Sequence, residues 1–353
     1  MKLIIMAGGT GGHIFPGIAV AHYLISNGWK VRWLGTFNNI EVDIVPKNGI
    51  DIDCININGI RNKGINNKII SILKIFSSIR KAIRIIKYWK PDVVLGMGGY
   101  VSGPGGLAAW ICRIPLILHE QNCVAGFTNR LLTILASKVL QAFPCSLYQE
   151  AVNVVVGNPI RKDLLSLQEP ILRINNRIGP IRVLVMGGSK GAKVLNNIMP
   201  LVAARSNLKL LHQVGNGALV EVTKKYAATN CKNSNIVVEF IDDIVSAYAW
   251  ADVVICRSGA ITVSEIASAG LPALFVPFIY HKDKQQYWNA RYLEKVGAAI
   301  IIEEYEFTVD RISKLLSILN RKKLLAMAQR ARSVAITDAT ERVAREVIAA
   351  VRI

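Results

Sequence analysis

The chain has 353 residues, of which 52% are hydrophobic, and it carries a formal net charge of +19 at pH 7. That length predicts two domains with separate cores, and the basic excess favours an anionic partner: nucleic acid, an acidic membrane surface or a phosphorylated substrate. Six cysteines without a Cys-x-x-Cys pair argue against a zinc site or a disulfide framework, and no apolar run reaches the ~18–20 residues that would span a membrane.

The first predicted strand, Lys2 to Ala7, leads into a glycine-rich loop and then a helix expected from about Pro16 to Ser26. The loop is not the dinucleotide-binding fingerprint, because Ile14 stands where the third glycine belongs, and no Gly-Lys-Ser/Thr of a Walker loop follows. Its glycines still allow a ligand to approach the backbone. His13 lies at the loop tip, at the strand's carboxyl end, where open α/β sheets bind ligands.

Residues 66 to 90 predict a long amphipathic helix that ends at Pro91. One apolar stripe at helical spacing suits a crossover helix that packs on a sheet. Seven basic residues lie along this segment: Lys68, Lys74, Arg80, Lys81, Arg84, Lys87 and Lys90. A solvated basic face is the simplest interpretation, and an anionic lipid surface is the alternative that the remaining apolar residues leave open.

A second glycine-rich loop follows the predicted strand Asp92 to Leu95 and contains Tyr100. The next strand, Pro115 to Leu118, runs directly into the polar sequence HEQN, which includes Glu120 and Asn122. Four polar side chains at the carboxyl end of a strand are more than a simple connection needs, so they are candidates for a site.

The second half begins again with a strand, Ile181 to Met186, and a third glycine-rich loop. This loop misses the Walker pattern, because Ala192 and Val194 stand where glycine and Ser/Thr are required. The mismatch argues against nucleotide hydrolysis but permits contact with a phosphate or a sugar. We place the domain boundary near Asn158 and expect a loop over residues 168–180.

Residues 251–290 predict a strand, a small-residue turn, a helix from Ala260 to Gly270 and a further strand. The free N–H groups and partial positive charge at the start of that helix suit a phosphate, and Glu265 lies further along it. Polar residues then cluster in the sequence: His281, Lys282, Asp283, Gln285, Gln286 and Asn289.

Seven segments in this order resemble the MurG family of peptidoglycan N-acetylglucosaminyltransferases. They are GGTGGHIFPG, GGYVSGPGG, HEQN, GNPIR, GGSKGA, RSGAITVSEIASAGLPALFVPF and HKDKQQYWNA. The resemblance implies an α/β architecture of the GT-B glycosyltransferase type, with two Rossmann-like domains whose parallel sheets face one another across a cleft. It assigns residues 1–158 to an acceptor-binding and membrane-associating domain, 159–335 to a UDP-GlcNAc-binding domain, and 336–353 to a helix that packs back on the first domain.

The same resemblance implies an inverting transfer of GlcNAc from UDP-GlcNAc to the 4-hydroxyl of MurNAc in undecaprenyl-pyrophosphoryl-MurNAc-pentapeptide. This step converts lipid I to lipid II in peptidoglycan synthesis. The expected location is peripheral, on the cytoplasmic face of the plasma membrane, with an anionic membrane surface as a partner. Neither a nucleic-acid partner nor a cofactor or metal is expected.

Family motifs also transfer candidate site residues to this chain. His13 resembles the family's candidate base, and Glu120 either orients or replaces it. The implied donor contacts are Thr10, Gly11, Gly12, Asn122, Arg161, Ser189, Ile241, Ala260, Ile261, Thr262, Val263, Ser264, Glu265 and Gln286, with Gln285, Asn289 and Tyr100 as secondary candidates. The loop before Gln285 is one residue longer than the family form, which leaves Gln285 and Gln286 as alternatives.

Within this assignment, Glu265 is expected to accept hydrogen bonds from the ribose hydroxyls, and Ile241 to offer its backbone to the uracil. The N–H groups near Ala260 and Ile261 face the diphosphate, where the helix N-terminus and Arg161 stabilise the leaving group without a metal. No Asp-x-Asp pair stands where it would hold that diphosphate through a metal.

Two other functions remain open from the sequence. A UDP-sugar epimerase of the same fold would keep the nucleotide site but has no use for a lipid-facing basic helix. A basic nucleic-acid-binding protein would need basic and aromatic residues interleaved over one surface, whereas the polar residues here gather in the glycine-rich loops.

Overall fold

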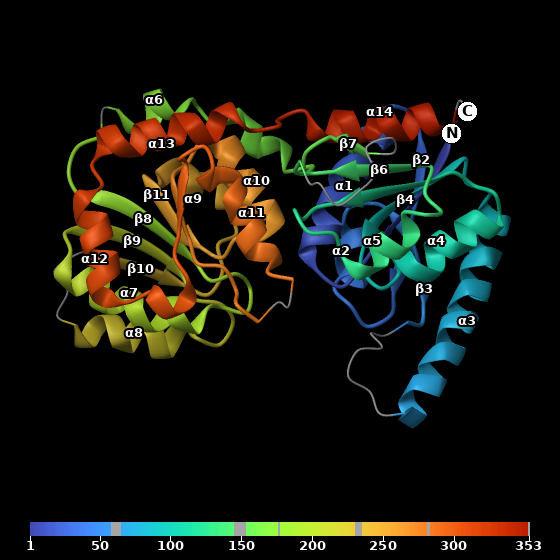
Figure 1. The fold of residues 1–353 in the computed structure, drawn as a ribbon, viewed down its shortest axis with the longest axis horizontal. Helices are drawn as coiled ribbons and strands as arrows, with labels where there is room; N and C mark the ends of the chain where they lie inside the picture. Colours follow the sequence, from blue (N-terminus) through green and yellow to red (C-terminus); the bar gives the residue numbers. More distant parts are fainter. Residues whose placement is uncertain (58–64, 145–152, 176, 230–234, 281–282, 352–353) are drawn as a thin grey trace. The chain divides into compact units, whose positions relative to one another are not determined.

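The computed structural model describes residues 1–57, 65–144, 153–175, 177–229, 235–280 and 283–351, with the side chains of 65–73 left out (Figure 1). The chain folds into two compact units. The first comprises Met1–Arg161 together with Asp338–Ile353, and the second comprises Lys162–Thr337. His281 and Lys282, part of the predicted polar cluster, lie outside the described residues.

The first unit is built on a parallel sheet with the strand order β3-β2-β1-β4-β5-β6-β7. Buried aliphatic side chains on both faces of its central strands make this sheet the core of the unit. Its strands are β1 Lys2–Ala7, β2 Lys30–Thr36, β3 Asp51–Ile55, β4 Val93–Gly98, β5 Leu116–Glu120, β6 Lys138–Gln141 and β7 Asn153–Val155.

Helices cover both faces of this sheet. Apolar residues of α1, α2 and α14 pack on one face, and those of α3, α4 and α5 pack on the other. These helices are α1 Gly11–Ser26, α2 Glu41–Lys47, α3 Ile65–Trp89, α4 Ser102–Ile111, α5 Phe127–Leu132 and α14 Ala339–Val351. The C-terminal helix α14 therefore completes the core of the first unit, against α1 (Figure 1).

The second unit repeats the plan with a parallel sheet in the order β10-β9-β8-β11-β12-β13. Its strands are β8 Ile181–Met186, β9 Leu208–Gln213, β10 Asn235–Val238, β11 Val253–Cys256, β12 Ala273–Phe275 and β13 Ala299–Ile301. Its helices are α6 Pro170–Ile174, α7 Lys193–Arg205, α8 Leu219–Ala228, α9 Ile244–Trp250, α10 Ala260–Ala269, α11 Gln285–Glu294, α12 Val309–Ile318 and α13 Arg321–Ser333, with 3-10 turns η2 Lys162–Ser166 and η3 Glu304–Glu306.

Two local expectations need correction. The first helix begins at Gly11 rather than near Pro16, so half of the predicted loop is the first turn of α1. Residues 170–174, expected to be loop, form the short helix α6. Pro170 suits its first turn, and the buried Arg173 fixes it by donating to the carbonyls of Gln168, Tyr248 and the α10 C-terminus.

A buried carboxylate ties the start of β11 to its surroundings. Asp252 is completely buried, and it accepts hydrogen bonds from Arg177 Nη1 at 2.7 Å, the Arg182 backbone N–H at 2.9 Å and Arg321 Nη2 at 3.3 Å. Each of its two oxygens is therefore satisfied by a donor, as a buried charge requires.

We predict that Asp252→Asn lowers the free energy of unfolding by about 2–4 kcal/mol, because an amide NH₂ would face donors and leave two arginines without their countercharge. Asp310→Asn makes the same change in the exposed Arg205–Asp310 pair, and it should cost less than about 1 kcal/mol. Urea unfolding of both variants measures the difference. Equal losses in the two variants would contradict a special role for Asp252.

Candidate active site

The candidate residues lie beyond the carboxyl ends of the strands, and Thr10 to His13, Ser189 and Ala260 to Glu265 follow the strands at which the order of each sheet reverses. In the first sheet this point lies between β1 and β4, and in the second it lies between β8 and β11. Such switch points open a crevice between the loops that leave neighbouring strands in opposite directions, and open α/β sheets bind ligands there. Each unit therefore has one candidate site at its own switch point.

In the first unit, the β1–α1 loop is held by a carboxylate that the sequence analysis missed. Glu41, at the start of α2, is fully buried and accepts from the Gly9 N–H at 3.1 Å, the Thr36 N–H at 3.1 Å and the Thr36 hydroxyl at 2.6 Å. Glu41 lies in no motif, so only the fold reveals that it anchors the loop. Thr10, the residue after Gly9, is exposed and is the N-cap of α1. Its side chain makes no hydrogen bond that caps the helix.

His13 lies in the first turn of α1, partly exposed. Its Nδ1 atom is 3.3 Å from the Gly8 carbonyl and 3.4 Å from the Thr10 hydroxyl. If Nδ1 carries the proton and donates to the Gly8 carbonyl, Nε2 presents a lone pair. Burial lowers the pKa of His13, and this effect outweighs the Gly8 hydrogen bond and the charges of Glu120 and Glu41, which raise it. The ring is therefore neutral at pH 7.

Glu120 is 3% exposed, and four donors surround its carboxylate. One oxygen accepts from the Asn122 N–H at 3.0 Å and the Asn122 amide at 3.2 Å, and the other accepts from the Gly126 N–H at 3.0 Å and the Asn129 amide at 2.9 Å. A carboxylate engaged in this way stabilises the loop between β5 and α5.

The other residues of HEQN form a buried polar network. His119 is fully buried; its Nε2 lies 2.9 Å from the Gly157 carbonyl and its Nδ1 lies 3.1 Å from the Gln121 amide, which also donates to the Met97 carbonyl at 2.7 Å. Burial lowers the pKa of His119 to about 4, so the neutral ring donates to Gly157 and accepts from Gln121. This network fastens the ends of β4 and β5 to the turn that precedes Arg161.

Arg161 is exposed, and its guanidinium carbon lies 5.7 Å from the centre of the ring of Phe15, the fifth residue of α1. This contact holds a cation next to the β1–α1 loop. Tyr100, a secondary candidate in the β4–α4 loop, is 57% exposed.

In the second unit, the helix α10 begins beside the β8–α7 loop, because Cys256 and Met186 are partners in the paired strands β11 and β8. Gly259 is its N-cap and provides no side-chain cap, so the helix itself leaves its first-turn N–H groups to other partners. Among the predicted contacts, Ile261, Thr262, Ser264 and Glu265 are partly exposed, whereas Ala260 and Val263 are buried. Because the side chains of Ala260 and Val263 are buried, only their backbone atoms are suited to contact a ligand.

Glu265 accepts a hydrogen bond from the Tyr248 hydroxyl at 3.2 Å. This tyrosine is almost completely buried, so it orients the carboxylate from beneath. Ser189 is exposed in the β8–α7 loop, and its carbonyl accepts from the Asn216 N–H at 3.1 Å, while Ile241 is partly exposed after β10. These residues belong to loops at the carboxyl edge of the same sheet.

The candidates on α11 are largely occupied with the protein itself. The Gln286 side-chain oxygen accepts from the Phe278 N–H at 2.9 Å, and its backbone carbonyl accepts from the Ser258 hydroxyl at 2.8 Å. Asn289 is fully buried and donates to the Ser258 carbonyl at 3.3 Å. Gln285, the first residue of α11, is partly exposed. Gln286 and Asn289 thus hold the turn before α10.

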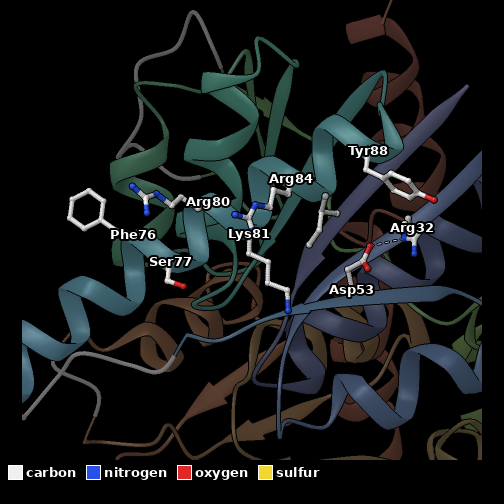
Figure 2. A pocket seen from close by; sticks show the side chains of 9 residues that line it. Arg32, Asp53, Phe76, Ser77, Arg80, Lys81, Arg84 and Tyr88 are labelled. Carbon is white, nitrogen blue, oxygen red and sulfur yellow. Dashed lines mark ion pairs between the residues drawn. The ribbon is translucent and has the colours of Figure 1, made fainter.

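A basic groove lies elsewhere on the first unit, along α3 and the strands β2 and β3 (Figure 2). We define it by Arg32, Asp53, Phe76, Ser77, Arg80, Lys81, Arg84, Ile85 and Tyr88. Asp53 pairs with Arg32 at 2.7 Å, which leaves the three basic side chains of α3 without a carboxylate inside the groove. It contains none of the predicted site residues.

The described part of the chain contains neither a membrane-spanning helix nor a metal-binding group of side chains. None of the helices described is long and apolar enough to cross a membrane. Among the same residues, no group of His, Cys, Asp and Glu is arranged to hold a metal ion.

Known proteins resemble this chain along nearly its whole length. Residues 3–141 match the glycosyltransferase family 28 N-terminal domain, and residues 182–343 match the C-terminal domain of that family. The chain is 61% identical over 353 residues to the UDP-N-acetylglucosamine--N-acetylmuramyl-(pentapeptide) pyrophosphoryl-undecaprenol N-acetylglucosamine transferase of Sodalis glossinidius, covering 99% of this chain and 98% of that one. The protein of the same name from Erwinia tasmaniensis is 59% identical, with 99% of each chain covered.

Among solved structures, MurG of Acinetobacter baumannii matches with a TM-score of 0.88 at 37% identity, covering 99% of both chains. The two parallel sheets, their strand orders and the family matches agree with the GT-B architecture expected from the sequence. The chain therefore belongs to glycosyltransferase family 28 and, within it, to the MurG family of N-acetylglucosaminyltransferases.

Proposed function

We propose that this protein transfers GlcNAc from UDP-GlcNAc to the 4-hydroxyl of MurNAc in undecaprenyl-pyrophosphoryl-MurNAc-pentapeptide, with inversion at the anomeric carbon. The observation that carries this proposal is the 61% identity, over practically the entire chain, to a transferase named for that donor and acceptor. The switch-point loops of both units support it, because they offer a phosphate-binding helix N-terminus in one unit and a neutral histidine in the other.

The second unit binds the nucleotide sugar in this proposal. The first-turn N–H groups of α10 and the positive end of its dipole stabilise the diphosphate as charge develops on the departing UDP. Glu265, oriented by Tyr248, accepts from the ribose hydroxyls, and the Ile241 backbone meets the uracil. Ser189 and Thr262 complete the polar surroundings, with Gln285 and the amide nitrogen of Gln286 as further donors.

The first unit supplies the base. His13 Nε2 removes the proton of the MurNAc 4-hydroxyl as that oxygen attacks the anomeric carbon, so the bond to UDP breaks on the opposite face. Its lowered pKa keeps the ring unprotonated at pH 7. Glu120 is the weaker candidate, because four hydrogen bonds already engage its carboxylate. We therefore assign Glu120 the role of shaping the loop that carries Asn122.

We further propose that the basic groove along α3 binds the anionic lipid surface on the cytoplasmic side of the plasma membrane, as a peripheral contact. Arg80, Lys81 and Arg84 line one side of this groove beside exposed Phe76 and Tyr88 (Figure 2). Cationic side chains attract anionic headgroups, and neighbouring aromatic rings suit the interface between headgroups and acyl chains.

Transfer of labelled GlcNAc from UDP-GlcNAc to a soluble analogue of the lipid-linked muramyl acceptor tests the reaction. We expect one disaccharide product per UDP released, and the same rate with a metal chelator because the α10 N-terminus carries the leaving-group charge. Epimerised UDP-sugar without transfer would instead identify a UDP-sugar epimerase. No sugar turnover together with strongly salt-dependent oligonucleotide binding would favour a nucleic-acid-binding protein.

Replacing the proposed base should slow the chemical step. We predict that His13→Ala lowers kcat by about 100-fold or more while the Kd for UDP-GlcNAc stays within about twofold, because a base acts only in the transition state. In the unmodified enzyme, protonation of His13 removes the base, so kcat should fall as the pH decreases, with a midpoint below 6.5, the ordinary pKa of histidine, because burial lowers the pKa of this ring. His22→Ala, on the exposed side of the same helix, serves as the control. A normal kcat in His13→Ala would eliminate this role.

Reversing charge in the basic groove should weaken membrane binding. We predict that the double variant Arg80→Glu and Arg84→Glu binds anionic phospholipid vesicles at least about 30-fold more weakly, since each lost cation contributed about 1 kcal/mol and the two new carboxylates are also repelled by the surface. Lys209→Glu with Lys224→Glu, both exposed on the second unit, changes the net charge equally and should have a much smaller effect. Vesicle sedimentation compares the two. Equal partitioning of both double variants would refute a specific role for the groove.

A further inference from the structure

A single arginine connects the ends of three neighbouring strands in the second sheet. Cys256, Phe275 and Ile301 are register partners at the carboxyl ends of β11, β12 and β13. Arg257 follows β11 directly, and Glu304 comes shortly after β13 in the 3-10 turn η3. The connection therefore lies at the same edge of the sheet as the start of α10.

The contacts of Arg257 use both terminal nitrogens of its guanidinium. Nη1 donates to the Val276 carbonyl at 3.0 Å, the Pro277 carbonyl at 3.3 Å and Glu304 Oε2 at 3.3 Å, and Nη2 donates to Glu304 Oε1 at 3.1 Å. The guanidinium carbon also lies 5.5 Å from the centre of the Phe278 ring. Its side chain is 14% exposed and that of Glu304 is 21% exposed, so solvent weakens this forked pair less than a surface pair.

The segment that Arg257 holds is in turn bonded to the proposed donor site. The Phe278 N–H donates to the Gln286 side chain at 2.9 Å, and the Ser258 hydroxyl donates to the Gln286 carbonyl at 2.8 Å. Ser258 immediately precedes Gly259, the N-cap of α10. A closed ring of contacts thus runs from Arg257 through the segment after β12 to α11, and back to the turn that starts α10.

We propose that Glu304 is a positioning residue for the nucleotide-sugar site, acting through Arg257. The inference rests on the proposed function, in which the first turn of α10 binds the donor diphosphate. Glu304 fixes the guanidinium by a bidentate pair, and the guanidinium fixes Val276 to Phe278, which fix α11 and the turn before α10. Without Glu304, Arg257 keeps only its carbonyl and ring contacts, so the N–H groups of α10 lose their fixed direction toward the diphosphate.

Glu304 lies outside all seven segments that carry the family resemblance. Its partner Arg257 is the first residue of one of these segments, but no pattern in the sequence indicates that Arg257 and Glu304 form an ion pair. Their relation follows from the strand order β11-β12-β13, which brings the two loops to adjacent places on one edge.

The test is the donor dependence of the Glu304→Ala variant in the full-length enzyme. We expect the KM and the Kd for UDP-GlcNAc to rise about tenfold, because the N–H groups of α10 lose their fixed direction toward the diphosphate, and kcat to fall in addition, because the same groups stabilise the charge that develops on the departing UDP. Glu306→Ala is the matched control. It removes the same charge from the same 3-10 turn, but Glu306 pairs with Arg311, so its KM and Kd should be unchanged.

A double-mutant cycle shows whether Glu304 acts through Arg257. Arg257→Lys keeps the positive charge but cannot form the bidentate pair with Glu304, so it should also raise the Kd for UDP-GlcNAc. Adding Glu304→Ala to this variant should cause no further rise in the Kd. Additive effects would overturn the proposal, as would an unchanged or lowered Kd in Glu304→Ala. Should Glu304→Ala fail to fold, Glu304→Gln, which keeps the size but loses the ionic pair, must show the same rise in KM and Kd. If the unmodified protein does not bind UDP-GlcNAc, the proposed function itself fails.

Discussion

At the carboxyl edge of both sheets, backbone packs directly on backbone. A Cβ atom on Gly99, in the β4–α4 loop, would lie 2.4 Å from the Gly8 carbonyl oxygen in the β1–α1 loop. A Cβ on Gly215 would lie 2.2 Å from the Gly191 nitrogen in the second unit. Both glycines have positive φ angles, 87° and 86°, which side chains rarely adopt. The glycine-rich loops therefore bring neighbouring strand ends close together, and the rest of each candidate site is built around that contact.

The backbone N–H groups of such closely packed loops need hydrogen-bond acceptors. Buried side chains of the protein provide these acceptors. Glu41 accepts the Gly9 N–H, and Glu120 accepts N–H groups of Asn122 and Gly126. The N-termini of α1 and α10 receive no side-chain cap from Thr10 and Gly259. The positive dipole ends of these two helices suit an anionic ligand.

The sequence predicts the order of strands and helices well where hydrophobic runs meet glycine or proline. β1 and β8 have the expected bounds, and α10 ends before Gly270 as expected. The predicted start of α1 was wrong, because the helix begins among glycines, which disfavour helix. The prediction of a loop at α6 was also wrong, because this helix depends on contacts of Arg173 with distant carbonyls. Glu41 and Glu304 could not be found for the same reason, since their roles depend on pairing across the sheet. The assignments of ligand contacts remain proposals that rest on the family motifs.

The anchors of the loops also affect the pKa of the proposed base. Burial lowers the pKa of His13, whereas the nearby carboxylates of Glu120 and Glu41 raise it, so the loop anchors reduce the effect of burial. An amide in place of either carboxylate would turn an NH₂ group toward the N–H donors that now bond to it. Here such a replacement also removes a charge that favours the protonated imidazole, so the pKa of His13 falls further and the ring becomes a weaker base. Loop shape and basicity are therefore coupled in this site, and neither carboxylate can change without altering both.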